Sequence, residues 1–274
     1  MHRASKVLAV GFGVVAGWVV APGLIVAGAG AQGPVPALNP AGRVPCGQYE
    51  AVSTGAVGTR FTRLLVQRKA RVTTTVTDYA ITGVSCADLT GDGEPELLAR
   101  TSSGGAHCCE RVRVWSLGEK PRLLLDYPAG NAAGAAGDDL DGDGVAELIL
   151  GDDGLAYFDD LDYSSSPSSI PLVACFSAGS VRDCTAEHPS VLRDAASRFR
   201  ERLAGPDHAT PGAVRGAALG LFAVSLLLDD DAQALEDVRN AVKDEKVLTW
   251  LERVKPKLEV WVEARGRKLK RPGS

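Results

Sequence analysis

The sequence predicts an α+β protein whose β-rich part precedes a helical part. In residues 46–188, runs of β-branched side chains such as 71–77, and stretches that alternate charged with apolar side chains, indicate strands. In residues 189–266 the period changes, because apolar side chains recur at every fourth position between 191 and 203. We therefore expect a β-rich domain at 46–188 and a helical region at 189–266.

The N-terminal residues 1–31 have the three parts of a secretory signal peptide: a basic start, an apolar stretch and small residues at the end. We expect cleavage after Ala31, or alternatively after Ala29, and therefore a secreted or extracytoplasmic protein, in the periplasm or at the cell surface. The alternative is an uncleaved membrane anchor, since about 20 apolar residues can span a bilayer. Residues 32–45 are rich in proline and are expected to form a linker.

A nine-residue pattern occurs twice, at 88–96 and again at 139–147. Both copies have Asp, Leu, Gly, Asp, Gly and Glu at positions 1, 2, 4, 5, 6 and 9. Side-chain oxygens at positions 1, 3 and 5 and the main-chain carbonyl at position 7 can converge on a calcium ion, while the glycine at position 6 permits the bend. The expected ligands are Asp88, Thr90, Asp92, Glu94 and Glu96 in the first loop, and Asp139, Asp141, Asp143, Val145 and Glu147 in the second.

The pattern is not that of an EF-hand, which needs a bidentate Glu at position 12, where this chain has Ala99 and Leu150. It resembles the calcium loops of FG-GAP and VCBS repeats, and residues 103–109 resemble a stretch of exported bacterial proteins of the VCBS-like kind. The resemblance implies loops set between strands, with calcium as the bound ion. Two copies are fewer than the 4–8 blades of a closed propeller, so we do not expect a whole propeller.

The six cysteines all follow the predicted signal peptide, and their even number predicts three disulfides in an oxidising compartment. Cys175 and Cys184 flank a turn-like segment between two strand-like runs, so a hairpin bridge between them is the first expectation. The other bridges would join Cys46 and Cys86 to Cys108 and Cys109. The alternative for the adjacent cysteines is a transition-metal site with His107, since thiolate and imidazole are suitable ligands.

The helical region is expected to hold a buried helix at 213–228, which is apolar on nearly all sides. A further helix at 247–262 is interrupted by Pro256, and residues 267–274 should be a basic, solvated tail. The net charge of −4 and the pI of about 5.6 give no reason to expect nucleic acid as a partner. Because the sequence has no second apolar span of that length, we expect no integral membrane association after signal cleavage. The expected partner is an unknown protein or envelope ligand.

Three functions fit these observations. The first is an exported calcium-binding, disulfide-stabilised module with a binding or structural role in the cell envelope. The second is a secreted hydrolase that uses a pair of aspartates outside the loops, among 152–162 or beside the second loop. The third is a membrane-tethered calcium sensor. The sequence has no serine-hydrolase elbow, zinc-protease motif or phosphate-binding glycine loop, so the expectation leans away from an enzyme.

Overall fold

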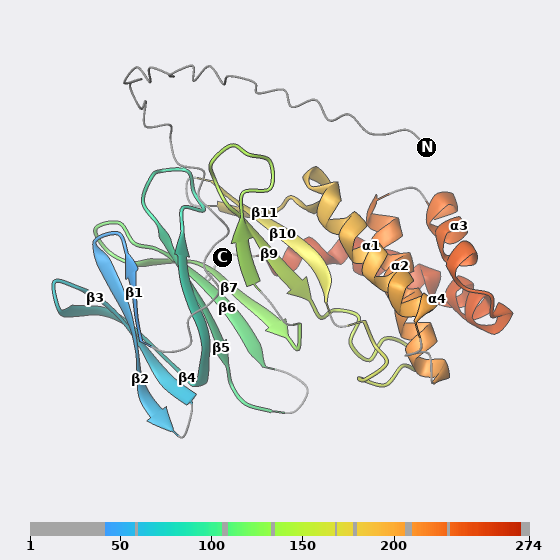
Figure 1. Cartoon of the computed structure of the whole chain (residues 1–274), viewed down its shortest axis with the longest axis horizontal. Helices are drawn as coiled ribbons and strands as arrows, with labels where there is room; N and C mark the ends of the chain where they lie inside the picture. Colours follow the sequence, from blue (N-terminus) through green and yellow to red (C-terminus); the bar gives the residue numbers. More distant parts are fainter. Residues whose placement is uncertain are drawn as a thin grey trace, which may run out of the picture. The chain divides into compact units, whose positions relative to one another are not determined.

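The computed structural model describes residues 42–57, 60–105, 109–132, 135–167, 169–177, 180–205, 210–228 and 231–269. The predicted signal peptide and most of the predicted linker lie outside these residues. Within them, strands fill the N-terminal part and helices the C-terminal part (Figure 1). The α+β architecture predicted from the change of hydrophobic period is therefore confirmed.

The first sheet contains seven antiparallel strands that follow one another in chain order. They are β1 (Arg43–Cys46), β2 (Tyr49–Val57), β3 (Arg60–Arg68), β4 (Arg71–Ala87), β5 (Glu96–Ser102), β6 (Glu110–Ser116) and β7 (Arg122–Gly130). Strand β1 begins inside the segment expected to be a linker. The β-branched run that predicted a strand lies at the start of β4, the longest strand in this sheet.

The second sheet contains four antiparallel strands in the order β11-β10-β9-β8. They are β8 (Ala135–Asp138), β9 (Glu147–Asp152), β10 (Ile170–Ser177) and β11 (Ser180–Asp183). One hydrophobic core contains buried side chains of both sheets, including Tyr127 of β7 and Leu172 of β10. The Tyr127 hydroxyl also donates a 3.1 Å hydrogen bond to the carbonyl of Gly151 in β9. The two sheets are therefore packed together as one β-rich unit.

The β-rich part contains the same arrangement twice. Strands β4 to β7 form one four-stranded meander, and strands β8 to β11 form a second. In each meander, one copy of the repeated nine-residue pattern connects the first strand to the second. The first meander is extended by β1, β2 and β3 along its free edge.

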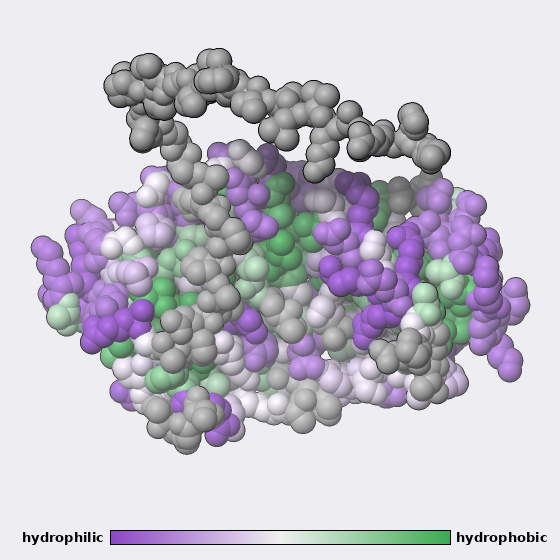
Figure 2. Space-filling model, in the orientation of Figure 1, coloured by the Kyte–Doolittle hydropathy of each residue, from purple (hydrophilic) through white to green (hydrophobic). Residues whose placement is uncertain are grey.

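The C-terminal part consists of helices whose shared core also includes Ile170 of the second sheet. They are η1 (Thr185–Glu187), α1 (Pro189–Ala204), α2 (Pro211–Leu228), α3 (Asp231–Ala241), α4 (Glu245–Ala264) and η2 (Arg265–Lys268). Among the described residues, α2 alone is long and apolar enough to cross a membrane, and its residues 216–225 are all buried in this fold. The visible face over the helices is largely hydrophilic (Figure 2), in agreement with the exposed charged side chains of α1 and α4.

The disulfides confirm one expected pairing and correct the other. Cys175 and Cys184 are joined across the β10–β11 hairpin, as predicted. Cys46, however, is joined to Cys86, with their Cα atoms 5.7 Å apart, so the prediction that each pairs with a vicinal cysteine is wrong. The reason is the curvature of the first sheet, which brings β1 into contact with β4 although β2 and β3 lie between them in the strand order. Cys109 also belongs to a disulfide, while His107 lies outside the described residues.

A loop aspartate fixes α4 to the β-rich part. Asp159, between β9 and β10, accepts hydrogen bonds of 2.7–3.1 Å from three α4 side chains, those of Trp250, Arg253 and Lys257. The hydrogen bond from Lys257, aided by those from Arg253 and Trp250, holds the pKa of this carboxyl well below its usual range. A carboxylate held by three donors on one helix is a specific anchor between loop and helix.

Two of the described residues that follow α4 are buried. Arg265, just before the expected tail of 267–274, is 3% exposed; within that tail Leu269 is 5% exposed and Arg267 is exposed. Leu269 belongs to the core shared by the two sheets. The Arg265 guanidinium donates to the main-chain carbonyl of Pro171 in β10 and lies 3.9 Å from the Asp183 carboxylate. The segment after α4 therefore fastens the helical region to the second sheet.

Candidate metal-binding loops

The two repeated loops occupy equivalent positions in their meanders. The first joins β4 to β5, and Glu96 lies opposite Ala87 in the strand pairing. The second joins β8 to β9, and Glu147 lies opposite Asp138. The glutamate at position 9 therefore opens the second strand of each hairpin, where the strand pairing fixes its main chain.

The two loops share one hydrogen-bond arrangement around the aspartate at position 1. Asp88 accepts from the N–H groups of Gly91 and Gly93 at 2.7 and 2.9 Å. Asp139 accepts in the same way from Gly142 and Gly144, at 2.7 and 3.0 Å. All four glycines have positive φ, between 72° and 90°, which L-residues rarely adopt. The glycines at positions 4 and 6 thus allow the main chain to wrap around the carboxylate.

The aspartate at position 5 and the glutamate at position 9 also have matching contacts. The position 5 carboxylates accept from the N–H at position 7, with distances of 2.9 Å for Asp92 and 2.8 Å for Asp143. Glu96 and Glu147 accept from the N–H at position 2, at 2.9 and 3.0 Å. Both loops are therefore held by their own acidic side chains, and the remaining carboxylate lone pairs can still face a cation.

The loops differ at position 3, where the second loop has a carboxylate and the first has a hydroxyl. In the second loop, Asp139, Asp141 and Glu147 each offer an oxygen, and these oxygens lie within 4.8 Å of one another. In the part of the chain that the structure describes, no such trio of ionisable groups occurs in the first loop, where Thr90 donates instead to Glu96 at 3.3 Å. Of the predicted acidic ligands in the second loop, Asp143 lies outside the trio.

The position 9 glutamates are in an environment that disfavours negative charge. Burial, with a smaller contribution from the nearby carboxylates of Asp92 and Asp88, raises the pKa of Glu96 to about 7 against the opposing hydrogen bonds from Leu89 and Thr90. Burial likewise raises the pKa of Glu147. A divalent cation beside these carboxylates would offset both their burial and their mutual repulsion.

The two loops also contact each other, which the sequence alone did not indicate. The Asp88 carbonyl accepts a 3.1 Å hydrogen bond from the N–H of Ala146. A Cβ atom on Gly91 would lie 2.9 Å from Val145 Cγ2, so this valine packs directly on the first loop. Val145 occupies position 7, whose carbonyl is an expected ligand in the second loop.

Substituting the position 4 glycines by alanine should therefore have unequal effects on the two loops. Gly142→Ala should cost about 1–2 kcal/mol, because alanine disfavours a positive φ and a Cβ there would have no neighbour within 4 Å. Gly91→Ala should cost about 1 kcal/mol more, because its Cβ would also press on Val145. Urea unfolding in the presence of a calcium chelator measures both costs without any contribution from bound ions. Equal losses of stability in Gly91→Ala and Gly142→Ala would contradict the contact between Gly91 and Val145. In a Val145→Ala background the difference between the two glycine variants should disappear.

The aspartates at 152–162, which the hydrolase alternative names, make structural contacts. They are Asp152, Asp153, Asp159, Asp160 and Asp162, and their partners include Gly154, Asn131, Lys257, Arg215 and Ser165 respectively. Asp152 is fully buried, and Asp159 is the anchor for α4. Each of these carboxylates therefore has a structural partner that accounts for its position.

No protein-family model, curated protein or solved structure matches this chain. The geometry of the loops and the position of the disulfides are thus the basis for a functional proposal.

Proposed function

We propose that this chain is an exported calcium-binding module of the cell envelope, stabilised by disulfides, with a binding or structural role and of the FG-GAP or VCBS-like kind. The observation that carries the proposal is the repeated loop, in which position 1 carboxylates organise the main chain identically in both copies. The partner would be a protein or another envelope ligand.

Calcium is the cation that suits this donor set. The loops offer carboxylate, hydroxyl and main-chain carbonyl oxygens, which are hard ligands, and no thiolate or imidazole belongs to the repeated pattern. Calcium accepts 6–8 oxygens in flexible geometry, whereas magnesium demands near-ideal octahedral coordination and keeps several waters. Loops of this kind can therefore hold calcium with side chains of differing length, as at position 3.

Export is supported by two features. The N-terminal residues have the pattern of a signal peptide, and disulfides such as Cys46–Cys86 and Cys175–Cys184 persist in oxidising compartments. Extracellular calcium sites operate at dissociation constants of about 10⁻⁴–10⁻³ M. Even loops with modest affinity would then be occupied outside the cytoplasm.

Calcium should stabilise the chain against thermal unfolding. At 100 times the dissociation constant, one site adds about 2.7 kcal/mol to the free energy of unfolding. We expect a chelator to lower the melting temperature, and calcium to restore it better than magnesium. Calorimetry that finds no calcium uptake, or a melting curve indifferent to the chelator, would contradict the proposal.

Exchanging the residues at position 3 tests the loops individually. The second loop should bind more tightly, because Asp141 supplies a carboxylate where Thr90 supplies a hydroxyl. Asp141→Thr should weaken the tighter site about tenfold and Thr90→Asp should tighten the weaker one, since the number of charged ligands tunes calcium affinity. Calorimetric titration of both variants measures the two constants, and a second loop that is unaffected by Asp141→Thr would refute its assignment as the tighter site.

A further inference from the structure

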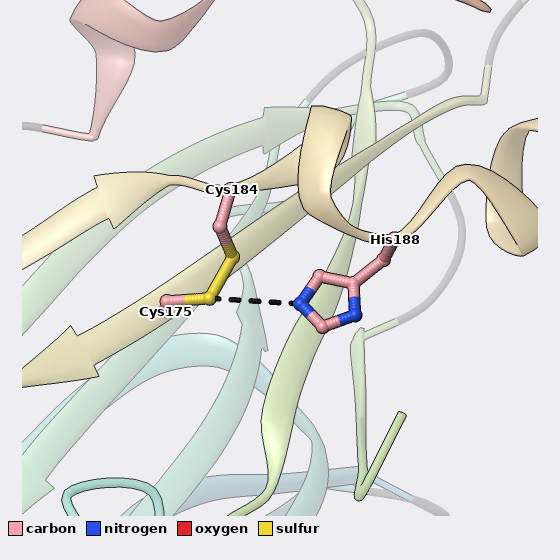
Figure 3. Close-up of side chains that lie close together, drawn as sticks. All are labelled: Cys175, Cys184 and His188. Atoms are coloured by element: carbon pink, nitrogen blue, oxygen red, sulfur yellow. Dashed lines mark hydrogen bonds between the residues drawn. A yellow bond between two sulfur atoms is a disulfide. The ribbon is translucent and has the colours of Figure 1, made fainter. Parts of the chain in front are cut away.

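A group of soft metal ligands lies apart from the oxygen-rich loops, where the β10–β11 hairpin meets the start of α1 (Figure 3). The sulfurs of Cys175 and Cys184 and a ring nitrogen of His188 all lie within 4.8 Å of one another. His188 Nε2 points at the Cys175 sulfur from 3.9 Å. In this structure the two sulfurs are joined as a disulfide.

The main chain holds the three residues in place independently of the disulfide. Antiparallel pairing fixes Cys175 opposite Arg182, and the N–H of Cys184 donates to the carbonyl of Val173 at 2.9 Å. The N–H of His188 donates to the carbonyl of Thr185 at 3.1 Å. The side chain of the same threonine accepts a 2.9 Å hydrogen bond from the N–H of Val173, which ties this turn to β10. A site built on such a frame is preorganised.

We propose that the reduced form of this cluster binds a zinc ion through the two cysteine thiolates and His188 Nε2. Two sulfurs and one imidazole nitrogen are a common zinc donor set, with a water or substrate completing the tetrahedron. Bonds of about 2.3 Å to sulfur and about 2.0 Å to nitrogen place those atoms roughly 3.5–3.8 Å apart, close to the 3.9 Å between Cys175 Sγ and His188 Nε2. The two sulfurs must move apart from their disulfide separation when their bond is broken.

The disulfide and the metal exclude each other, which makes this site dependent on redox state. A phosphine and one water reduce the disulfide to two thiols and leave the phosphine oxide. Zinc then displaces the two thiol protons as it forms two zinc–sulfur bonds. Cys175 is half-buried while Cys184 and His188 are buried, so the site is reached from the side of Cys175. The ligands are sulfur and nitrogen, so this site is chemically distinct from the calcium loops.

Cobalt titration of the full chain after phosphine reduction tests the proposal. One equivalent of Co²⁺ should produce a thiolate-to-cobalt charge-transfer band in the near ultraviolet, and one equivalent of Zn²⁺ should abolish it. His188→Gln should weaken zinc binding by at least about tenfold, since even changes in the groups around a metal ligand cost that much. The Cys175→Ser/Cys184→Ser variant should give no band. A band that survives in this variant, or an unchanged affinity in His188→Gln, would overturn the assignment.

Alkylation of the unsubstituted chain provides a test that does not depend on variants. Zinc should protect Cys175 and Cys184 in the reduced chain from iodoacetamide, as mapped by peptide mass analysis, while Cys46 and Cys86 should react at the same rate with or without zinc. Far-ultraviolet circular dichroism records whether the reduced chain stays folded. Equal reactivity of all four thiols with and without zinc, in a folded or an unfolded chain, would refute the site.

Discussion

Replacing Arg265 by alanine is expected to lower the free energy of unfolding by about 3–5 kcal/mol, because the substitution removes the positive charge that offsets the buried carboxylate of Asp152. Arg265 is 3% exposed, and the carboxylate of Asp152, which its charge interacts with, is fully buried. Burial lowers the pKa of the Arg265 guanidinium, while the charges of Asp183 and Asp152 raise it. Without the guanidinium, the Asp152 carboxylate would stay buried and lose the attraction of this charge.

Two further variants separate the role of this charge from a general effect of truncation. Arg267→Ala removes an exposed arginine two positions later, and we expect it to change stability by no more than about 0.5 kcal/mol. Adding Asp152→Asn to Arg265→Ala should recover part of the loss, because it removes the uncompensated carboxylate. Urea unfolding monitored by circular dichroism measures the free energy of unfolding of Arg265→Ala, Arg267→Ala and the double variant. A loss below about 1 kcal/mol for Arg265→Ala would show that the segment after α4 does not fasten the helices to the second sheet.

Local patterns in the sequence predicted much of this fold, because the forces behind them act over short distances along the chain. The β-branched run at 71–77, the apolar helix at 213–228 and the hairpin bridge of Cys175 to Cys184 all depend on residues close in sequence. The repeated loops were recognisable for the same reason, since nine residues contain both the acidic side chains and the glycines that position them.

Features that depend on distant segments could not be predicted in this way. The Cys46 to Cys86 bridge requires the first sheet to curve until β1 meets β4, and no property of either cysteine indicates that curvature. Arg265 directly precedes the basic stretch expected to be a solvated tail, yet its partners belong to strands far away in sequence. Even Pro256, expected to interrupt the last helix, lies inside a continuous α4, whose buried face is held by tertiary packing.

The contact between the two loops is also a consequence of tertiary structure. Because of it, the residues at position 8 make different contacts in the two loops, although the loops share one sequence pattern. Ala146, at position 8 of the second loop, has an N–H that donates to Asp88 in the first. The first loop has Pro95 at the same position, which has no N–H to donate. Instead, Pro95 packs against Gly47 in the turn between β1 and β2. The second loop therefore contacts the first loop, and the first loop contacts the turn between β1 and β2, next to Cys46.

Removal of the Cys46–Cys86 disulfide should consequently destabilise the chain more than removal of Cys175–Cys184. The two bridges span 40 and 9 residues, and loop-closure entropy then predicts roughly 4 and 2.5 kcal/mol of stabilisation. The longer bridge also fixes the turn on which Pro95 packs. If the first loop binds calcium as proposed, loss of this bridge should additionally weaken that binding. Urea unfolding of the Cys46→Ala/Cys86→Ala and Cys175→Ala/Cys184→Ala variants, each with the other bridges oxidised, measures the difference. If Cys175→Ala/Cys184→Ala lost as much stability as Cys46→Ala/Cys86→Ala, the prediction that the Cys46–Cys86 bridge contributes more stability would be wrong.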